Sequence, residues 1–219
     1  MVRVQQLHEW AVTEDEAVAI QQRLRERVVV SDDHGSINRV AGLDVAYRDP
    51  DTAVGVVTVL DSESLTVLDQ AVVYEQIDFP YVSGLFAFRE VPALTRALER
   101  LTVEPDVLIC DGHGLAHPRR FGLAAHLGVL TDLPSIGVAK NSYGEFTEPG
   151  PARGDWSPVT SDGETVGRVL RTQPEVKPIY VSVGHRFTLE SACDLVLHLA
   201  PRYRLPETTR TADHLGRIS

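Results

Sequence analysis

Cysteine is scarce in this sequence, and long hydrophobic runs are absent. The 2 cysteines among 219 residues cannot form a disulfide framework, and Cys110 and Cys193 both lie in apolar runs. This pattern predicts buried free thiols in a reducing compartment. No apolar run approaches the length of a membrane-spanning helix, and residues 1–17 contain no apolar signal-peptide core. We therefore expect a cytoplasmic protein with no membrane partner.

Positive charge is also in deficit, because 21 basic residues stand against 31 acidic ones and the formal net charge is −10. Phosphate neutralisation requires lysine and arginine, so the deficit predicts modest non-specific affinity for nucleic acid. Acidic residues dominate residues 49–78, however, and basic residues flank the motifs described below, which makes a basic face on an acidic body compatible with the sequence. These basic residues are Arg119, Arg120, Lys140, Arg186, Arg202 and Arg204.

The length and the 43% hydrophobic content predict one domain over residues 1–219. Thr13-Glu14-Asp15-Glu16 is a capping box, and apolar residues follow it at helical spacing, which predicts a helix there. The period then changes to that of strands with short connections, which predicts an antiparallel three-stranded meander. The predicted strands are 39–47, 53–61 and 65–74.

The segment from Asp106 to Lys140 carries most of the candidate chemistry. Its apolar strand 107–110 stops at Asp111-Gly112, and open α/β sheets bind ligands at that edge. Pro118 suits the first position of a helix over residues 119–130. A second strand, 135–139, ends at Lys140, one of two lysines in the chain.

The rest of the chain is expected to complete an α/β fold. Pro92 suits the start of a helix that runs to about Leu101, which places Glu90 at the N-terminus of that helix. Residues 141–164 are rich in Gly, Pro, Asp and Ser and predict a long irregular excursion. Two further strands, a last helix and a polar tail follow it. Their ranges are 165–171, 179–183, 188–200 and 201–219.

Asp44 interrupts the otherwise apolar strand Val40–Ala46, and a carboxylate there requires a partner such as a metal ion to offset its desolvation. The order of the acids resembles that of the ribonuclease H-like fold. Asp44 lies on the first strand of the meander, Glu90 at the following helix and Asp111 after the next strand. That fold is a mixed α/β sheet with an antiparallel three-stranded meander, then parallel strands, and helices on both faces. Acids from distant positions suit Mg²⁺, a hard ion that prefers oxygen ligands.

Five ordered sequence blocks resemble one family within that fold, the endonuclease V family. They are PYVSGLFAFRE (80–90), DGHGLAHPRR (111–120), LPSIGVAK (133–140), KPIYVSVGHR (177–186) and RLPETTRTAD (204–213). The resemblance implies a metal-dependent endonuclease of DNA repair that recognises deoxyinosine, the product of adenine deamination. It would cut the second phosphodiester 3′ to the lesion and leave 3′-hydroxyl and 5′-phosphate ends.

The same resemblance implies roles for particular residues. Asp44, Glu90 and Asp111 would hold Mg²⁺, for which Mn²⁺ would substitute, and His117 and Lys140 would lie at the scissile phosphate. The family's C-terminal acid-or-histidine position falls on Asp213, with His214 as the adjacent alternative. The number of metal ions stays open.

Base recognition is implied for a further set of residues. Tyr81 would belong to a wedge that enters the helix beside the lesion, which is how enzymes reach an atom hidden in a base stack. Nucleic-acid contacts would come from Gly84, Phe86, Gly112, Leu123, Ala139, Arg119 and His185, the first five of them near a pocket for the extruded hypoxanthine. Two family prolines are replaced here, by Ser83 and Val183, which puts the stiffness of the wedge in question.

The expected partner is damaged DNA, single- or double-stranded, bound by a monomer. The alternatives are an endoribonuclease specific for inosine in RNA, another ribonuclease H-like nuclease of junctions or RNA:DNA hybrids, and a non-catalytic nucleic-acid-binding module with the same fold. Loss of one of the three acids would mark the non-catalytic module, and all three are present.

Overall fold

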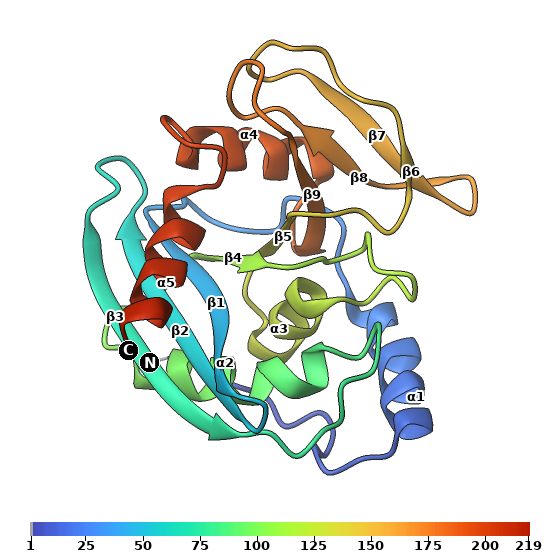
Figure 1. Cartoon of the computed structure of the whole chain (residues 1–219), viewed down its shortest axis with the longest axis vertical. Helices are drawn as coiled ribbons and strands as arrows, with labels where there is room; N and C mark the ends of the chain where they lie inside the picture. The colour runs from blue at the N-terminus through green and yellow to red at the C-terminus, as the bar shows by residue number, and fades with distance from the viewer. Residues whose placement is uncertain (1) are drawn as a thin grey trace.

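The computed structural model describes residues 2–219 and is built around one mixed sheet of nine strands, in the order β3-β2-β1-β4-β5-β9-β8-β7-β6 (Figure 1). β1 pairs antiparallel with β2 and parallel with β4, β4 pairs parallel with β5, and β5 pairs antiparallel with β9. The predicted mixed sheet with its leading meander is therefore confirmed. The strands are β1 (Arg39–Asp49), β2 (Thr52–Asp61), β3 (Val67–Gln76), β4 (Val107–Asp111), β5 (Ser135–Ala139), β6 (Glu145–Phe146), β7 (Trp156–Ser161), β8 (Glu164–Leu170) and β9 (Ile179–His185).

Helices cover both faces of this sheet. α2 and α3 pack behind the first strands in the view of Figure 1, and α4 and α5 lie on the opposite face. None of the helices in residues 2–219 is long and apolar enough to cross a membrane. The helices are α1 (Glu14–Leu24), η1 (Arg25–Arg27, a 3₁₀ turn), α2 (Ala87–Arg100), α3 (Leu123–Thr131), α4 (Leu189–Leu199) and α5 (Glu207–Ile218).

Alternation along β1 divides its side chains between the two faces. Ala41 and Leu43 enter the core under α2 and α3, whereas Gly42 faces α5. A Cβ at Gly42 would lie 2.0 Å from the carbonyl oxygen of Thr208, so α5 packs this closely only on a residue without a side chain. The next residue on that face is Asp44.

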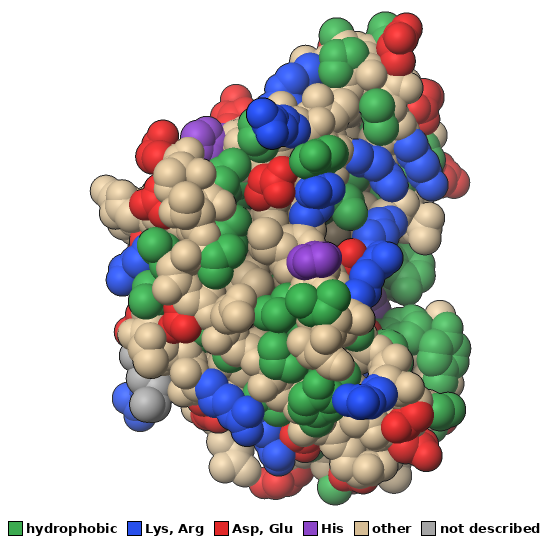
Figure 2. Space-filling view, turned by 60° about the vertical axis from the view of Figure 1, so that its left-hand side comes forward, with side chains coloured by type: hydrophobic (Ala, Val, Ile, Leu, Met, Phe, Trp, Pro, Cys, Tyr) green, Lys and Arg blue, Asp and Glu red, His purple; other side chains and the backbone are tan. Residues whose placement is uncertain are grey.

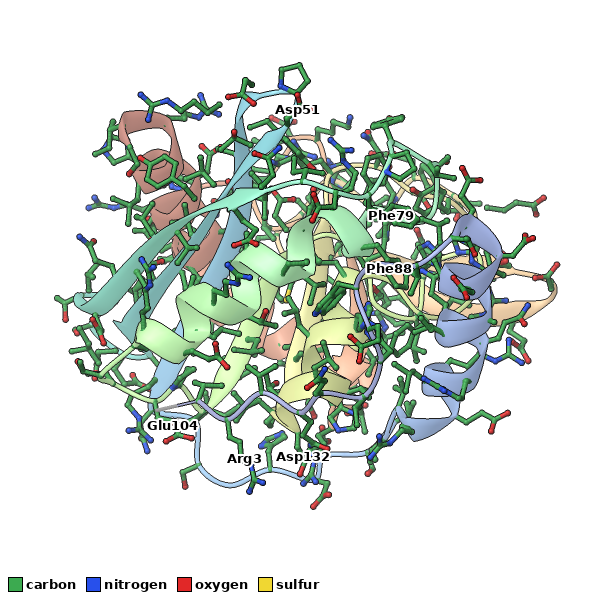
Figure 3. All side chains as sticks on the ribbon, turned by 90° about the horizontal axis from the view of Figure 1, so that it is seen from below. Arg3, Asp51, Phe79, Phe88, Glu104 and Asp132 are labelled. Atoms are coloured by element: carbon green, nitrogen blue, oxygen red, sulfur yellow. The ribbon has the colours of Figure 1, made fainter. Side chains whose placement is uncertain are left out.

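The capping box at Thr13 and Glu16 is confirmed, but the predicted start of the next helix is wrong. α2 begins at Ala87, and Pro92 lies inside it. The Phe88 side chain is buried in the first turn, where its ring faces Phe79 at a centroid distance of 5.4 Å (Figure 3). This burial offsets the backbone hydrogen bond that proline cannot donate.

Other parts of the prediction also differ from the structure. The expected irregular excursion over residues 141–164 contains the strands β6 and β7. The helix expected from residue 119 begins at Leu123, because the preceding segment folds back so that the amide of Gly122 donates to the Gly114 carbonyl and Arg120 adopts a left-handed φ of 57°. The expected polar tail contains α5, which buries Thr208, Thr209 and Ala212 against the sheet. Cys110 and Cys193 are buried and free, as predicted.

Candidate active site

Asp44 lies within β1, beside the end of the neighbouring parallel strand β4, where Asp111 is the last residue. Leu43 pairs with Cys110, so the two acids follow paired residues on the face that α5 covers. Burial is the main effect on Asp44 and raises its pKa to about 6, with the Asp111 and Asp213 charges acting in the same direction and Lys140 opposing. A half-buried carboxylate with a raised pKa indicates a site that favours an added cation.

Lys140 supplies the positive charge in this group. Its Nζ lies 2.5 Å from Oδ2 of Asp111, and the lysine side chain is 45% exposed. Burial opposes the lysine charge, but the hydrogen bond and charge of Asp111 outweigh it and raise the pKa of Lys140. The ammonium and the Asp111 carboxylate therefore form a close ion pair at the end of β4 and β5.

Glu90 approaches the same strand ends from the first turn of α2. The hydroxyl of Tyr47 donates a hydrogen bond to its Oε1 at 2.9 Å. Burial raises the pKa of Glu90 to about 7; the Tyr47 hydrogen bond lowers it, and the charges of Asp44 and Asp111 raise it further. The prediction that α2 carries an acid to the strand ends is thus supported by the electrostatic coupling of the three carboxylates.

Asp213 on α5 adds a fourth negative charge that acts on Asp44 and Lys140, and it pairs with Arg217 at 3.0 Å. The adjacent His214 lies with Val67 in a separate surface groove between β3 and α5. Of the two candidates, Asp213 is the one coupled to the acids. Within residues 2–219, no three His, Cys, Asp or Glu side chains form a group that could hold a metal ion by themselves.

A cavity of about 250 Å³ opens beside the acids and includes Glu90 and Asp111 in its wall. Of the residues predicted to contact the base, four line it, namely Gly84, Phe86, Gly112 and Leu123. Ala139 does not, because its side chain packs in a separate apolar cluster with Ala116 and Tyr180. The further lining residues are Gln21, Ala87, His113, His117, Gly122 and Tyr143.

His117 lies in the cavity wall with both ring nitrogens engaged by the protein. Its Nδ1 accepts from the backbone amide of Arg119 at 3.1 Å, so Nε2 carries the proton and donates to the Gly84 carbonyl at 3.0 Å. Burial, with the Arg119 charge, lowers the pKa of His117 to about 4. A neutral ring held in this way shapes the cavity.

His113 and Tyr143 form another part of the wall. Their rings lie 4.9 Å apart, and the Nδ1 atom of His113 is buried with no hydrogen-bond partner among residues 2–219. Burial lowers the pKa of His113 to about 4, although a backbone hydrogen bond with Asn141 and the Asp111 charge oppose the change. The ring is therefore neutral at pH 7.

Tyr81 stands at the tip of the loop that borders the cavity. Its side chain is 73% exposed and meets Phe86 edge-to-face, with ring centroids 4.9 Å apart. An exposed aromatic ring supported from beneath is suited to insertion between bases.

His185 requires a correction. β9 runs antiparallel to β5, and His185 pairs with Ser135 at the strand end opposite Lys140. The ring is buried, with Nδ1 accepting from the amide of Val29 at 3.2 Å and Nε2 3.5 Å from Oδ1 of Asp132. The expectation that His185 contacts nucleic acid at this site is wrong, because the strand direction carries it to the other edge of the sheet.

Sequence reasoning missed Gln21, Tyr47 and Tyr143. Gln21 had a detectable signal, because it is a polar residue next to Ile20 on the apolar face of α1 and is fully buried. Tyr47 and Tyr143 had no signal in the sequence, since their roles depend on contacts with the distant residues Glu90 and His113.

A family model described as endonuclease V matches residues 22–214. The chain belongs to the endonuclease V family. Among its relatives, an endonuclease V of Roseiflexus sp. (strain RS-1) is 56% identical over 213 residues, which cover 95% of this chain and 96% of the relative. As a member of this family, the protein is a nuclease.

Two solved endonuclease V structures have the same fold. The Streptomyces avermitilis enzyme superposes with a TM-score of 0.92 at 49% identity, covering 100% of this chain and 96% of that one. The Ciona intestinalis enzyme superposes with a TM-score of 0.81 at 29% identity, covering 93% and 96% respectively. The latter is in complex with a 24mer DNA containing an inosine followed by a ribo-adenosine.

Proposed function

We propose that this endonuclease V is a magnesium-dependent repair enzyme that recognises deoxyinosine in DNA. It hydrolyses the second phosphodiester on the 3′ side of the lesion and leaves 3′-hydroxyl and 5′-phosphate ends. The observation that carries the proposal is the convergence of Asp44, Asp111 and Glu90 at the ends of the central strands, beside a cavity of about 250 Å³. The inosine-containing DNA bound by the Ciona relative supports the choice of lesion.

The donor set fits Mg²⁺. Asp44 and Asp111 offer carboxylate oxygens on one face. Burial, and after it the Asp111 charge, raises the pKa of Asp44, so a divalent cation would offset the cost of keeping Asp44 ionised. Mg²⁺ usually takes one or two carboxylates together with waters and substrate phosphate oxygens, so it does not require a cluster of three protein ligands. Mn²⁺ has the same ligand preference.

When bound, the ion would polarise the scissile phosphate and stabilise the leaving 3′-oxygen. Asp44, Asp111 and Glu90 would hold it. The Lys140 ammonium beside Asp111 would orient the attacking water or neutralise charge on the phosphate. The Asp213 charge, which acts on Asp44 and Lys140, would favour cation binding.

The cavity serves the base in this proposal. Its backbone edges at Gly84 and Gly112 let amide and carbonyl groups approach the rim of a purine, and Tyr81 would fill the space that the extruded base leaves. Weak pairing of hypoxanthine lowers the cost of extrusion. The protein would act as a cytoplasmic monomer.

Charge is distributed in a way that suits this substrate. On the face shown in Figure 2, Lys and Arg side chains are most concentrated in the upper right part, with others scattered lower down, although the chain as a whole is acidic. Such a local concentration of basic side chains supports contact with a phosphate backbone while the net charge of −10 limits non-specific binding.

A second candidate is cleavage of inosine-containing RNA. The DNA bound by the Ciona relative has a ribo-adenosine directly after the inosine, which favours testing a ribonucleotide at that position here. The same catalytic residues would serve both substrates.

The test is cleavage of an end-labelled duplex carrying one deoxyinosine, beside an inosine-free duplex, with magnesium and with a chelator. The expected product is one magnesium-dependent nick at the second phosphodiester 3′ to the lesion, lost in Asp44→Asn and Asp111→Asn. A matched oligonucleotide with inosine in single-stranded RNA distinguishes the second candidate. Cutting that ignores inosine, or that persists in chelator, would contradict the proposal.

A further inference from the structure

The carbonyl oxygen of Gly84 is the meeting point of three side chains from two distant segments. It accepts hydrogen bonds from Nε2 of Gln21 at 3.1 Å, from Nε2 of His117 at 3.0 Å and from Nη2 of Arg119 at 2.6 Å. Three donors on one buried carbonyl exceed the usual two, which indicates that the position of this peptide is closely controlled.

Gln21 is the residue that closes this network. It is fully buried on α1; its Nε2 also donates to the Phe121 carbonyl at 3.2 Å, and its Oε1 accepts from Nε of Arg119 at 2.5 Å. The side chain therefore uses both donor hydrogens and its acceptor. We call Gln21, Gly84, His117, Arg119 and Phe121 the Gly84 network.

Gly84 ends the short wedge loop, residues 80–84, whose tip is Tyr81. It has a φ of +77°, and a Cβ there would lie 2.7 Å from Nη2 of Arg119. The network thus fixes the loop at its base, while Tyr81 at its tip stays exposed. A buried fully satisfied polar network specifies one geometry.

The same network forms one wall of the cavity, where Gln21, Gly84 and His117 lie together. Any movement of the Gly84 peptide would change the position of the wedge loop and the width of the cavity at once. Pro80 is the one proline in residues 80–84, and Ser83 adds no ring constraint beside Gly84, so the base of the loop depends on such anchoring.

We propose that Gln21 is a positioning residue for lesion recognition, which acts through the Gly84 carbonyl and Arg119 to hold the wedge loop and the cavity wall in their substrate-binding geometry. This inference rests on the proposed function and assigns to α1 a part in it. Gln21 does not contact the carboxylates, so its loss should impair substrate capture and leave the chemical step intact.

The experiment is single-turnover cleavage of the deoxyinosine duplex over a range of enzyme concentrations. Gln21→Met keeps the length of the side chain and removes all three of its hydrogen bonds. We expect the half-saturating enzyme concentration to rise about tenfold, with the maximal rate within about twofold of the wild type. Gln21→Glu keeps an acceptor for Arg119 but loses both hydrogen bonds donated to the Gly84 and Phe121 carbonyls, so it should raise half-saturation as well. It serves as the test variant if Gln21→Met does not fold.

A structural role alone is excluded by two comparisons. Leu24→Ala removes a buried side chain from the same helix without touching the network, so it should lower the melting temperature and leave half-saturation unchanged. In the double variant Gln21→Met/Tyr81→Ala, the half-saturating enzyme concentration should rise no further than in the more impaired single variant. The reason is that both changes impair the same wedge loop.

Three results would overturn the inference. In the first, Leu24→Ala raises the half-saturating enzyme concentration as much as Gln21→Met does. In the second, the effects of Gln21→Met and Tyr81→Ala multiply in the double variant. In the third, Gln21→Met folds and its half-saturating concentration is unchanged. Failure of the wild-type enzyme to prefer the inosine duplex would instead overturn the proposed function, and this inference with it.

Discussion

The Tyr47 hydroxyl on β1 donates a hydrogen bond to Oε1 of Glu90 on α2 across 2.9 Å. This hydrogen bond joins β1, the first strand of the meander, to α2 beside the carboxylates of Asp44 and Asp111. The bond favours the ionised form of Glu90, whereas burial and the neighbouring acids favour the protonated form. The Tyr47 contact therefore opposes the burial and the acidic neighbours that favour a protonated Glu90.

Replacing Tyr47 by Phe should raise the pKa of Glu90 above its present value of about 7, because the bond that stabilises the carboxylate is lost. A hydrogen bond to a charged group contributes about 1.5–3 kcal/mol, equivalent to about one to two pH units. The measurement is a pH titration of the Glu90 carboxyl carbon by NMR in metal-free protein. Tyr74→Phe, on the exposed strand β3, is the control and should leave the titration unchanged.

Replacing Glu90 by Gln should stabilise the metal-free protein at pH 8. The pKa of Glu90 in the fold, about 7, lies above its ordinary value of 4.5, so Glu90 favours the folded state at low pH and this contribution is lost as the pH rises through 7. The gain in free energy of unfolding should be about 3 kcal/mol at pH 8 and near zero at pH 4. Urea titrations of both proteins across this range measure the difference, and a gain independent of pH would contradict the assignment.

Replacing Gly84 by Ala should damage recognition of the lesion. Alanine at a φ of +77° is strained by about 1–3 kcal/mol, and its Cβ would press on Nη2 of Arg119. We expect cleavage of the deoxyinosine duplex at subsaturating enzyme to fall about tenfold or more. Gly35→Ala is the matched control, since nothing lies within 4 Å of an added Cβ there.

Replacing Tyr81 by Ala should weaken binding of lesion-containing duplex more than it slows cleavage at saturating enzyme. Because the side chain is 73% exposed, the melting temperature should not change. Loss of one base-stacking aromatic is expected to cost about 1–3 kcal/mol of affinity. Fluorescence anisotropy with and without inosine measures it, and an equal loss on both substrates would rule out a wedge.

Local patterns along the sequence carried much of the prediction. The capping box at Thr13, the three-stranded meander and the strand that stops at Asp111 are each encoded by neighbouring residues, and the structure contains all three. The ordered blocks around Asp111 and Lys140 also identified the family, since they are long and occur in a fixed order.

Other features were decided by packing between distant residues. α5 was not predicted, and its position is set by packing in which Thr208 meets Gly42 and Ala212 meets the meander. Pro92 is tolerated inside α2 because the apolar first turn of that helix is buried. In both cases tertiary burial outweighs local propensity.

The sequence by itself determined that an acid, a glycine-rich bend and a lysine stand at strand ends, because strand and turn chemistry are local. Only the tertiary structure decided which of these groups meet. The parallel pairing of β1, β4 and β5 brings Asp44, Asp111 and Lys140 to one edge, whereas the antiparallel β9 takes His185 to the other. The direction of a strand within a sheet is set by the whole chain path, which no short segment encodes.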